Sequence, residues 1–373
     1  MGCLPFFIGL QSFKEKRNPF LLVHIFICTF ALILAMMQKA MQDQRPVMVS
    51  VKCLTYNHAP YIRQCIEGIL MQETDFRYEI ILHDDASTDG TTEILREYEQ
   101  NHPDVIRVLY EEENQFALGS SMHKVDAMTR GKYWAVCEGD DYWIDPHKLQ
   151  KQVDVMEAYP DCMLVCNRTL LFSMKSQSMV GENYCYNESR FVSTKDIIYR
   201  GGLFISTCSL LFRPEVKENF PDYCRECKAG DYPVQLMAAM KGRVYYINEP
   251  MSVYRIDNPL SWMGMHVWSE ERYKDRLLTA RSQINMLIGF AKDYPRHAHL
   301  FINKIANHIN RFAPGKEMPT YIRKAYQEEF APEIRQFSLP WRIDHFVGTT
   351  WIPMIWRVRM FYYSKFKQKI KRY

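Results

Sequence analysis

The sequence has little net charge and no repeated or compositionally biased segments. Its 47 lysines and arginines nearly balance 43 aspartates and glutamates, which leaves a formal net charge of +4 over 373 residues. A balance this mild gives no reason to expect a nucleic-acid partner. The lack of an internal repeat excludes a repeat array, and the 47% hydrophobic content is ample for one large domain or two.

The eleven cysteines lack the pattern of a disulfide framework. They are scattered and lie mostly in apolar runs, which is typical of buried free thiols in a reducing cytosol. Cys224 and Cys227 have a spacing found in metal and redox sites. No second pair of this kind occurs in the chain, so a structural zinc is disfavoured.

What the sequence does contain is a regular alternation of strand and helix patterns. Strands are predicted at 48–54, 78–82, 105–110, 133–137, 162–172, 203–212, 244–247 and 251–255. Helices are predicted at 61–72, 91–101, 123–129, 148–159 and 231–240. Residues 173–200 are expected to form a loop, with a short helix that Ser193 caps. This order predicts an α/β fold with a mostly parallel sheet flanked by helices.

Three of the predicted strands end in polar residues that can build a nucleotide pocket. These residues are Thr55-Tyr56-Asn57, then Asp84-Asp85, and then Glu138-Gly139-Asp140-Asp141. Parallel strands bring their carboxyl ends to one edge of the sheet, where ligands bind. There Tyr56 can stack on a base and Asp85 can accept the imide N–H of a pyrimidine such as uracil. For Asp84 a turn-and-cap role is the alternative.

The third of these strand ends predicts a metal site. Neighbouring carboxylates repel one another unless a cation joins them, and oxygen ligands suit Mg²⁺ or Mn²⁺. Asp140 and Asp141 are the expected ligands, and the ion would hold a diphosphate and stabilise its departure. An isolated Asp-Asp pair would indicate only a solvated acidic turn. Asp145-Pro146, just beyond, is the predicted start of the next helix.

Taken together, residues 49–145 resemble the nucleotide-binding half of a family 2 glycosyltransferase with a GT-A fold. The resemblance lies in Thr55-Tyr56-Asn57, in residues 84–91 and in residues 138–143. It implies that Asp85 contacts the base and that Asp140 and Asp141 match the metal-binding DxD motif. Glu138 stands where relatives often have Asp and is a further candidate ligand.

The resemblance also implies a catalytic role for Asp231, at the start of a late helix. From the residues alone Asp231 is a helix cap, where the dipole favours its charged form. Inverting members of the family carry a carboxylate base at this place, which would take the proton from the acceptor hydroxyl. Relatives often have Tyr-Arg-x-His later in the chain. Here Asp257 replaces that His, and Arg255 can either neutralise a phosphate or pair with an acid.

These features predict an inverting, metal-dependent glycosyltransferase. The donor would be a nucleotide-diphosphate sugar, UDP-linked by preference, and the acceptor a glycan or lipid-linked sugar in surface polysaccharide biosynthesis. A sugar nucleotidyltransferase is an alternative, but the loop at 55–60 lacks the Gly and Lys of its phosphate loop. A processive synthase is disfavoured because no Gln-x-x-Arg-Trp motif is present. A non-catalytic nucleotide-sugar-binding protein on the same fold is the third reading.

The two ends of the chain bear on location. Residues 20–37 are nearly all apolar and follow Lys14, Lys16 and Arg17, so they can be a membrane anchor, a signal peptide or a consequence of start-site choice. The thiols and the nucleotide-sugar chemistry favour a cytoplasmic body, associated with the membrane on its cytoplasmic face. We expect four parts: a segment at 1–47, a GT-A domain at 48–258, a helical appendage at 259–336 and a tail at 337–373. The tail interleaves basic and aromatic residues, which suits a membrane surface or an ordinary packed helix.

Overall fold

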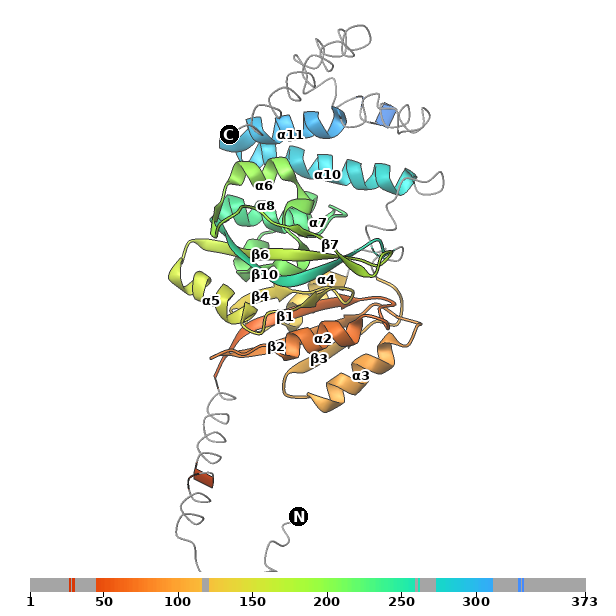
Figure 1. Ribbon diagram of the computed structural model, residues 1–373. Coiled ribbons are helices and arrows are strands. Elements are labelled where there is room, and N and C mark those ends of the chain that lie inside the picture. Colours follow the sequence, from red (N-terminus) through yellow and green to blue (C-terminus); the bar gives the residue numbers. More distant parts are fainter. Residues whose placement is uncertain are drawn as a thin grey trace, which may run out of the picture.

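The computed structural model describes residues 45–115, 121–258 and 273–310, together with 27, 29, 30, 261, 328, 329 and 331 (Figure 1). Within them lies a ten-stranded sheet with the order β3-β2-β1-β4-β9-β6-β10-β5, where β7 pairs with β6 and β8 with β10. The strands are β1 (Val47–Thr55), β2 (Arg77–Asp84), β3 (Ile106–Tyr110), β4 (Tyr133–Val136), β5 (Tyr142–Trp143), β6 (Cys162–Ser173), β7 (Ser178–Asn183), β8 (Arg190–Val192), β9 (Leu211–Phe212) and β10 (Arg243–Ile256).

The longer strands pair in parallel and helices cover them. β1 pairs in parallel with β2 and β4, β2 with β3, and β6 with β10, whereas the antiparallel pairs involve β5, β7, β8 and β9. The helices are α2 (Ile62–Leu70), α3 (Thr91–Asn101), α4 (Ser121–Met128), α5 (Lys148–Ala158), α6 (Thr194–Arg200), α7 (Asp222–Arg225), α8 (Asp231–Lys241), α10 (Tyr273–Asp293) and α11 (Ala298–Asn310). The predicted fold class is confirmed, including the helices after the sheet.

Alternation along β1 shows why the sheet is buried on both faces. Val49, Val51 and Cys53 point into one hydrophobic core, which also contains residues of α2, α3 and α5. Lys52 faces the other way and is 1% exposed. Its ammonium pairs with Asp126 of α4 at 2.8 Å, so the buried charge has a partner.

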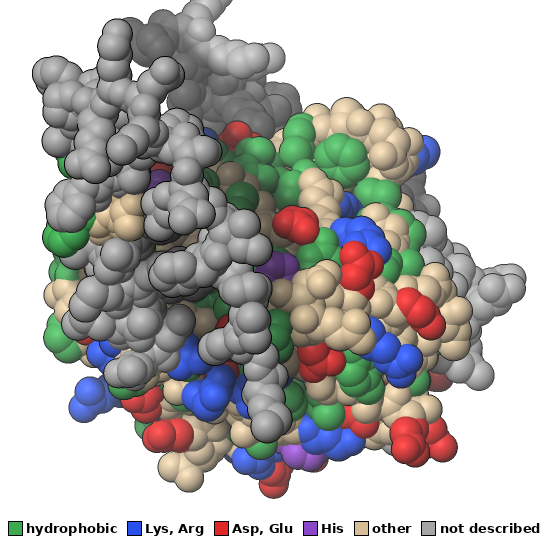
Figure 2. Space-filling view, turned by 90° about the horizontal axis from the view of Figure 1, so that it is seen from below, with side chains coloured by type: hydrophobic (Ala, Val, Ile, Leu, Met, Phe, Trp, Pro, Cys, Tyr) green, Lys and Arg blue, Asp and Glu red, His purple; other side chains and the backbone are tan. Residues whose placement is uncertain are grey.

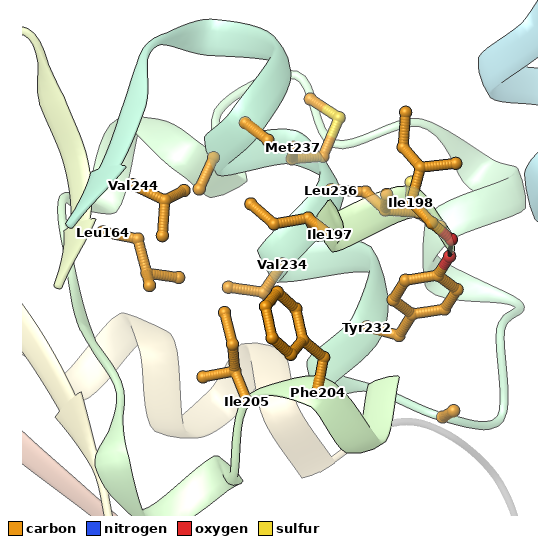
Figure 3. Packing of buried hydrophobic residues seen from close by; sticks show 14 of the residues in the cluster. Leu164, Ile197, Ile198, Phe204, Ile205, Tyr232, Val234, Leu236, Met237 and Val244 are labelled. Atoms are coloured by element: carbon orange, nitrogen blue, oxygen red, sulfur yellow. Dashed lines mark hydrogen bonds between the residues drawn. The ribbon is translucent and has the colours of Figure 1, made fainter. Parts of the chain in front are cut away.

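A second core fills the other side of the sheet. There α6 and α8 pack on β6 and β10, with Ile197 and Ile198 against Leu236 and Met237 (Figure 3). Helices α10 and α11 extend this core, and in Figure 1 they lie beyond α6 and α8, on the side away from α2 and α3. The helices after the sheet therefore share apolar packing with α8, while the domain boundaries themselves stay predictions.

Two predicted segments differ from the structure. The strand predicted at 203–212 is wrong for most of its length, because two 3-10 helices (Gly202–Phe204 and Thr207–Ser209) precede the short β9. A continuous apolar run marks a segment as buried without specifying its backbone. The loop expected at 173–200 contains β7 and β8, although Ser193 does cap α6 by accepting the N–H of Asp196 at 3.2 Å.

The helix after the acidic residues follows the predicted range 148–159, whereas the start predicted at Asp145-Pro146 is wrong. α5 starts at Lys148, and Asp145 instead accepts the N–H of His147 at 2.8 Å. Lys148, the first residue of α5, is charged and yet 0% exposed. Its ammonium lies 4.0 Å from the centre of the Trp143 ring and donates to Gln152. Further along, the two strands predicted at 244–255 are one strand, β10, with register shifts at Pro250.

Within the described residues no helix is both long and apolar enough to cross a bilayer. The apolar segment at 20–37 lies outside the described residues except for positions 27, 29 and 30. The tail at 337–373 lies outside the described residues, as does most of the expected helical appendage beyond residue 310. On the face seen from below, Figure 2 shows acidic and basic side chains interspersed over the coloured part.

Candidate active site

The acidic turn, residues 138–141, joins β4 to β5. The backbone N–H groups of Cys137 and Gly139 donate to the carbonyl oxygens of Lys52 and Leu54 on β1, at 3.1 and 2.9 Å. The pairing of β4 with β1 therefore continues past the end of β4. This continuation fixes the turn at the carboxyl end of the parallel strands, where ligands of such sheets bind.

Three carboxylates meet in the acidic turn. Glu138, Asp140 and Asp141 each offer an oxygen atom, and these oxygens lie within 4.8 Å of one another. In the part of the chain that the structure describes, no other group of three or more His, Cys, Asp or Glu side chains could share an ion. Oδ2 of Asp141 is buried and has no hydrogen-bond partner. A buried acceptor without a donor fits a ligand atom for a hard cation.

The charges in the acidic turn oppose one another. Burial raises the pKa of Asp141 well above its usual value, and the charges of Asp140 and Glu138 raise it further. Burial also raises the pKa of Glu138 to about 8, with Asp140 and Asp231 adding to the effect. A divalent cation would reverse this balance and hold the carboxylates ionised. The residues therefore fit Mn²⁺ or Mg²⁺, and Glu138 lies with the two expected ligands.

The first two strand-end loops are joined by hydrogen bonds before any ligand is considered. Asn57, in the left-handed region at φ 55°, donates its N–H to Ser87 Oγ at 3.0 Å and accepts the N–H of Thr88 at 2.8 Å. The N–H of Ala59 donates to Asp89 at 3.0 Å. Asn57, expected to bind nucleotide, thus uses its side chain to hold the second loop in place.

Thr55 and Tyr56 differ in what they offer a ligand. Thr55 is buried, and a Cβ on Gly139 would lie 2.9 Å from its hydroxyl and 2.7 Å from Nδ1 of His58. Only glycine lets the acidic turn approach the first loop this closely. Tyr56 is 46% exposed, so it remains accessible to a ligand.

Asp84 and Asp85 are adjacent in sequence and have different surroundings. Both carboxylate oxygens of Asp84 are occupied, by the N–H of Ser87 at 3.1 Å and by the hydroxyl of Thr92 at 2.5 Å. These contacts support the turn-and-cap role for Asp84. Asp85 accepts the backbone N–H of Gln115 at 2.6 Å, a donor of the same type as the imide of a pyrimidine.

Arg255 supports the acidic turn from β10. Its backbone N–H donates to Oδ1 of Asp141 at 2.9 Å, and its guanidinium donates to the carbonyl oxygen of Asp140. The guanidinium also lies between the rings of Tyr61 and Tyr142, at 5.1 and 4.5 Å from their centres. The guanidinium thus contacts a backbone carbonyl oxygen of the acidic turn, and both roles left open for Arg255, neutralising a phosphate and pairing with an acid, stay predictions.

Asp231 is the first residue of α8, after the cap residue Gly230. Its Oδ1 accepts the N–H of Tyr232 at 2.8 Å and its Oδ2 accepts an amide N–H of Gln235 at 3.3 Å. Burial raises the pKa of Asp231 to about 6 and outweighs the backbone donors, which lower it. The helix N-terminus alone therefore does not keep this pKa low, yet the carboxylate is mainly ionised at neutral pH. Its charge acts on Glu138, so the candidate base lies near the acidic turn.

Sequence reasoning did not find two residues of this region. His58 is half-buried beside Gly139, and burial lowers its pKa against the opposing charges of Asp140 and Asp89. Gln235 contacts Asp231 from one turn along α8. The spacing of four residues was visible in the sequence, but an isolated glutamine in an apolar helix does not indicate which group it contacts. Cys224 and Cys227 are buried free thiols.

Comparisons with known proteins bear on this arrangement. Residues 50–220 match the model of the family described as Glycosyl transferase family 2. An uncharacterized protein of Mycobacterium tuberculosis is 31% identical over 207 residues, 56% of this chain and 58% of the relative. A Bacillus subtilis protein named as a candidate teichuronic acid biosynthesis glycosyltransferase, TuaG, is 33% identical over 138 residues, 36% of this chain and 49% of the relative. The chain spans about half of the length of these relatives, 58% of the first and 49% of the second.

Solved structures give distant likenesses. Staphylococcus aureus TarS in complex with UDP-GlcNAc is 14% identical, with a TM-score of 0.48 over 81% of this chain and 92% of that chain. The mannosyltransferase PcManGT of Pyrobaculum calidifontis, in complex with GDP-Man and Mn²⁺, is 18% identical, with a TM-score of 0.47 over 83% and 81%. These likenesses are too weak to bear on substrate or mechanism. The match to the model of glycosyltransferase family 2 covers the strand-end loops and the acidic turn, within residues 50–220.

Proposed function

We propose that the chain is an inverting glycosyltransferase that moves a sugar from a nucleotide-diphosphate sugar to an acceptor hydroxyl. The observation that carries this proposal is that a candidate metal site and a candidate base lie near each other at one edge of the sheet. A three-carboxylate group suited to a divalent cation lies near a fourth carboxylate, Asp231, whose charge acts on Glu138. A leaving diphosphate needs a cation to neutralise its charge, and an attacking hydroxyl needs a base to take its proton.

The donor is proposed to be UDP-linked. The Asp85 carboxylate accepts a backbone N–H at the end of β2, and the exposed Tyr56 follows Thr55, whose carbonyl oxygen accepts the N–H of Asp85. A uracil base offers both an imide N–H and a face for stacking. Glu138, Asp140 and Asp141 would hold Mn²⁺ or Mg²⁺, which neutralises charge on the departing diphosphate.

In the reaction Asp231 accepts the proton of the acceptor hydroxyl as that oxygen attacks the anomeric carbon. The new carbon–oxygen bond forms on the face opposite the bond to the diphosphate, which breaks and carries its electron pair to the leaving group. The anomeric centre is inverted in a single displacement. The pKa of about 6 keeps Asp231 ionised at neutral pH and able to take the proton.

The acceptor is proposed to be a glycan or a lipid-linked sugar of a surface polysaccharide. The Bacillus subtilis relative TuaG, with teichuronic acid in its name, supports this class. The nine cysteines that the structure describes are free and buried, which supports a body in the reducing cytoplasm. Association with the cytoplasmic membrane face, the anchor at 20–37, and the division at 47, 258 and 336 stay proposals from the sequence.

Two carboxylate-to-amide variants test the proposal, because each should remove a different step. Asp141→Asn should abolish metal-dependent binding of UDP, measured by calorimetry with and without Mn²⁺, because it removes a ligand charge. Asp231→Asn should keep that binding but lower turnover about a thousandfold, the size of a lost general base. Slow hydrolysis of a panel of UDP-sugars, in which water takes the place of the acceptor, gives a readout without an identified acceptor.

The exposed carboxylate of Asp104 provides the matched control, since Asp104→Asn should change neither quantity. Binding of GDP, CDP or dTDP in preference to UDP would overturn the donor assignment alone. Normal turnover in Asp231→Asn would remove it as the base. A folded protein that binds no nucleoside diphosphate, with or without metal, would contradict the whole proposal.

A further inference from the structure

Gln235 is a buried amide one turn beyond Asp231 on α8. Residues four apart lie on the same face of a helix, so its side chain runs beside the Asp231 carboxylate. Gln235 is 0% exposed, whereas the apolar residues around it fill the second core. A buried amide that makes no useful hydrogen bonds is costly, which directs attention to its partners.

Three oxygen atoms surround the amide nitrogen of Gln235. Nε2 lies 3.3 Å from the carbonyl oxygen of Gly202, 3.1 Å from that of Ile205 and 3.3 Å from Oδ2 of Asp231. Carbonyl and ionised carboxylate oxygens only accept hydrogen bonds, so the amide must present its NH₂ group to them. Oε1 of the same amide is buried without a partner. The orientation that lets Nε2 contact these three oxygens therefore leaves Oε1 without a hydrogen bond.

The two carbonyl partners belong to a loop that lies against the candidate base. Residues 201–205 follow α6, and Gly201 has a positive φ of 78°. A Cβ on Gly202 would lie 3.2 Å from the Cβ of Tyr232 and 3.7 Å from Oδ1 of Asp231. Phe204 and Ile205 pack on Val234, as Figure 3 shows, while Leu203 between them is 69% exposed. One amide thus ties the loop and the carboxylate together.

We infer that Gln235 is a positioning residue for the glycosyl transfer: it holds the Asp231 carboxylate toward the acceptor by an N–H donated to Oδ2. The same amide fixes the loop at 201–205, whose exposed Leu203 forms part of the surface that an acceptor meets. This inference rests on the proposed role of Asp231 as the base. A donor to the ionised carboxylate also favours its charged form, which a base needs.

Two variants separate positioning from packing. Gln235→Met keeps an unbranched side chain of similar volume but removes the donor, and Gln235→Glu keeps the shape but places a second carboxyl beside Asp231. Both should lower kcat for donor hydrolysis about tenfold to a hundredfold, the effect of a misplaced catalytic group. Gln235→Met should also move the acid limb of the kcat–pH profile upward by about one pH unit. Gln235→Glu should move it further, because like charges oppose ionisation.

The measurement uses saturating UDP-sugar and Mn²⁺, so that donor binding does not shape the profile. The titratable groups that Asp231 affects are Glu138, Cys227 and Tyr232, and none of them is altered. Metal-dependent binding of UDP, unchanged within about threefold, would show that each variant is folded. Gln72→Met is the matched control. Gln72 is a buried glutamine beside the first core whose Oε1 accepts the N–H of Leu149, and its replacement should leave the acid limb of the kcat–pH profile in place.

The outcomes distinguish this inference from the proposed function. A uniform fall in kcat with an unmoved acid limb in both Gln235 variants would reduce Gln235 to packing and overturn the inference. Normal turnover in Asp231→Asn would instead overturn the proposed base, whatever the Gln235 variants show. An upward shift in Gln235→Met together with an inactive Asp231→Asn supports both.

Discussion

At the scale of single residues, burial sets the chemistry of the carboxylates in the site. Asp231 and Glu138 have pKa values of about 6 and about 8, each raised first by burial. For Asp231 the shift stops below neutral pH, so the group can accept a proton and still release it. For Glu138 and its neighbours the shift marks a set of charges that needs a cation.

The pH dependence of turnover follows from Asp231. Because the ionised form is the base, kcat should rise with pH as Asp231 deprotonates around 6. At about pH 5 the rate should be about tenfold lower than at about pH 7. The measurement is donor hydrolysis at saturating UDP-sugar and Mn²⁺, with UDP binding followed over the same range as the control. A flat profile below neutral pH would contradict the assignment.

The sequence could indicate candidate site residues where polar side chains directly follow a predicted strand. Asp85, Asp140 and Asp141 follow apolar runs, so their place at the sheet edge follows from local pattern alone. Lys148 and Gln235 could not be placed this way. Their roles depend on partners distant in the chain or on the orientation of a side chain, such as the Trp143 ring over Lys148 and the Gly202 carbonyl at Gln235.

At the scale of elements, α2 holds the acidic turn from the side of the first core. Gly68 of α2 lies against the backbone of β5, where a Cβ would be 2.8 Å from the carbonyl oxygen of Trp143 and 3.0 Å from its nitrogen. Backbone atoms at that distance cannot move aside independently of the strand. β5 follows Asp141 directly, so the position of the proposed metal ligands depends on this close approach.

Gly68→Ala should therefore destabilise the protein although alanine favours helices. We expect a loss of about 1–3 kcal/mol in the free energy of unfolding, since overpacking outweighs the gain in helix propensity. Mn²⁺-dependent binding of UDP should weaken as well. Urea denaturation and calorimetry measure the two effects. Gly181→Ala in β7 is the control, because its Cβ would first meet Leu171 at 3.9 Å, and increased stability of Gly68→Ala would contradict this account.

Elements were predictable from the sequence where the apolar pattern was periodic. α3 begins and ends at the predicted residues, 91 and 101, because its buried positions recur at helical spacing. The run at 203–212 has buried residues without a period, and its backbone follows from contacts with α8 and β6. β7 has mostly exposed side chains, so pairing with β6 and not hydrophobic pattern makes it a strand.

At the scale of the whole molecule, the two hydrophobic cores support different parts of the candidate site. The first lies under the nucleotide-binding loops, whereas the second joins α8, which carries Asp231, to α10 and α11. Phe290 of α10 is central to the second core and stacks on Phe301 of α11, with ring centres 5.3 Å apart. The helices after the sheet thus share a core with the helix of Asp231, the proposed base, and not with the loops proposed to bind the nucleotide.

Phe290→Ala should show this division. A buried phenylalanine replaced by alanine costs about 3–5 kcal/mol, so the midpoint of urea denaturation should fall. In the folded variant, turnover should fall more than Mn²⁺-dependent UDP binding, because the cavity opens on the side of Asp231. Leu278→Ala, 53% exposed on the same helix, should change neither. Equal losses in turnover and in UDP binding would mean that the cores are not separable.

The hydrogen bonds between the loops at 55–59 and 87–91 have a consequence for the timing of a catalytic cycle. Their backbone amides are already paired, through Asn57, Ser87 and Asp89, so little of this part of the pocket is left to order when a nucleotide arrives. Ordering of this part then costs little entropy during capture of the donor. For the proposed transfer we therefore expect the slow part of each cycle to be the arrival of the acceptor, the transfer itself or the release of the diphosphate.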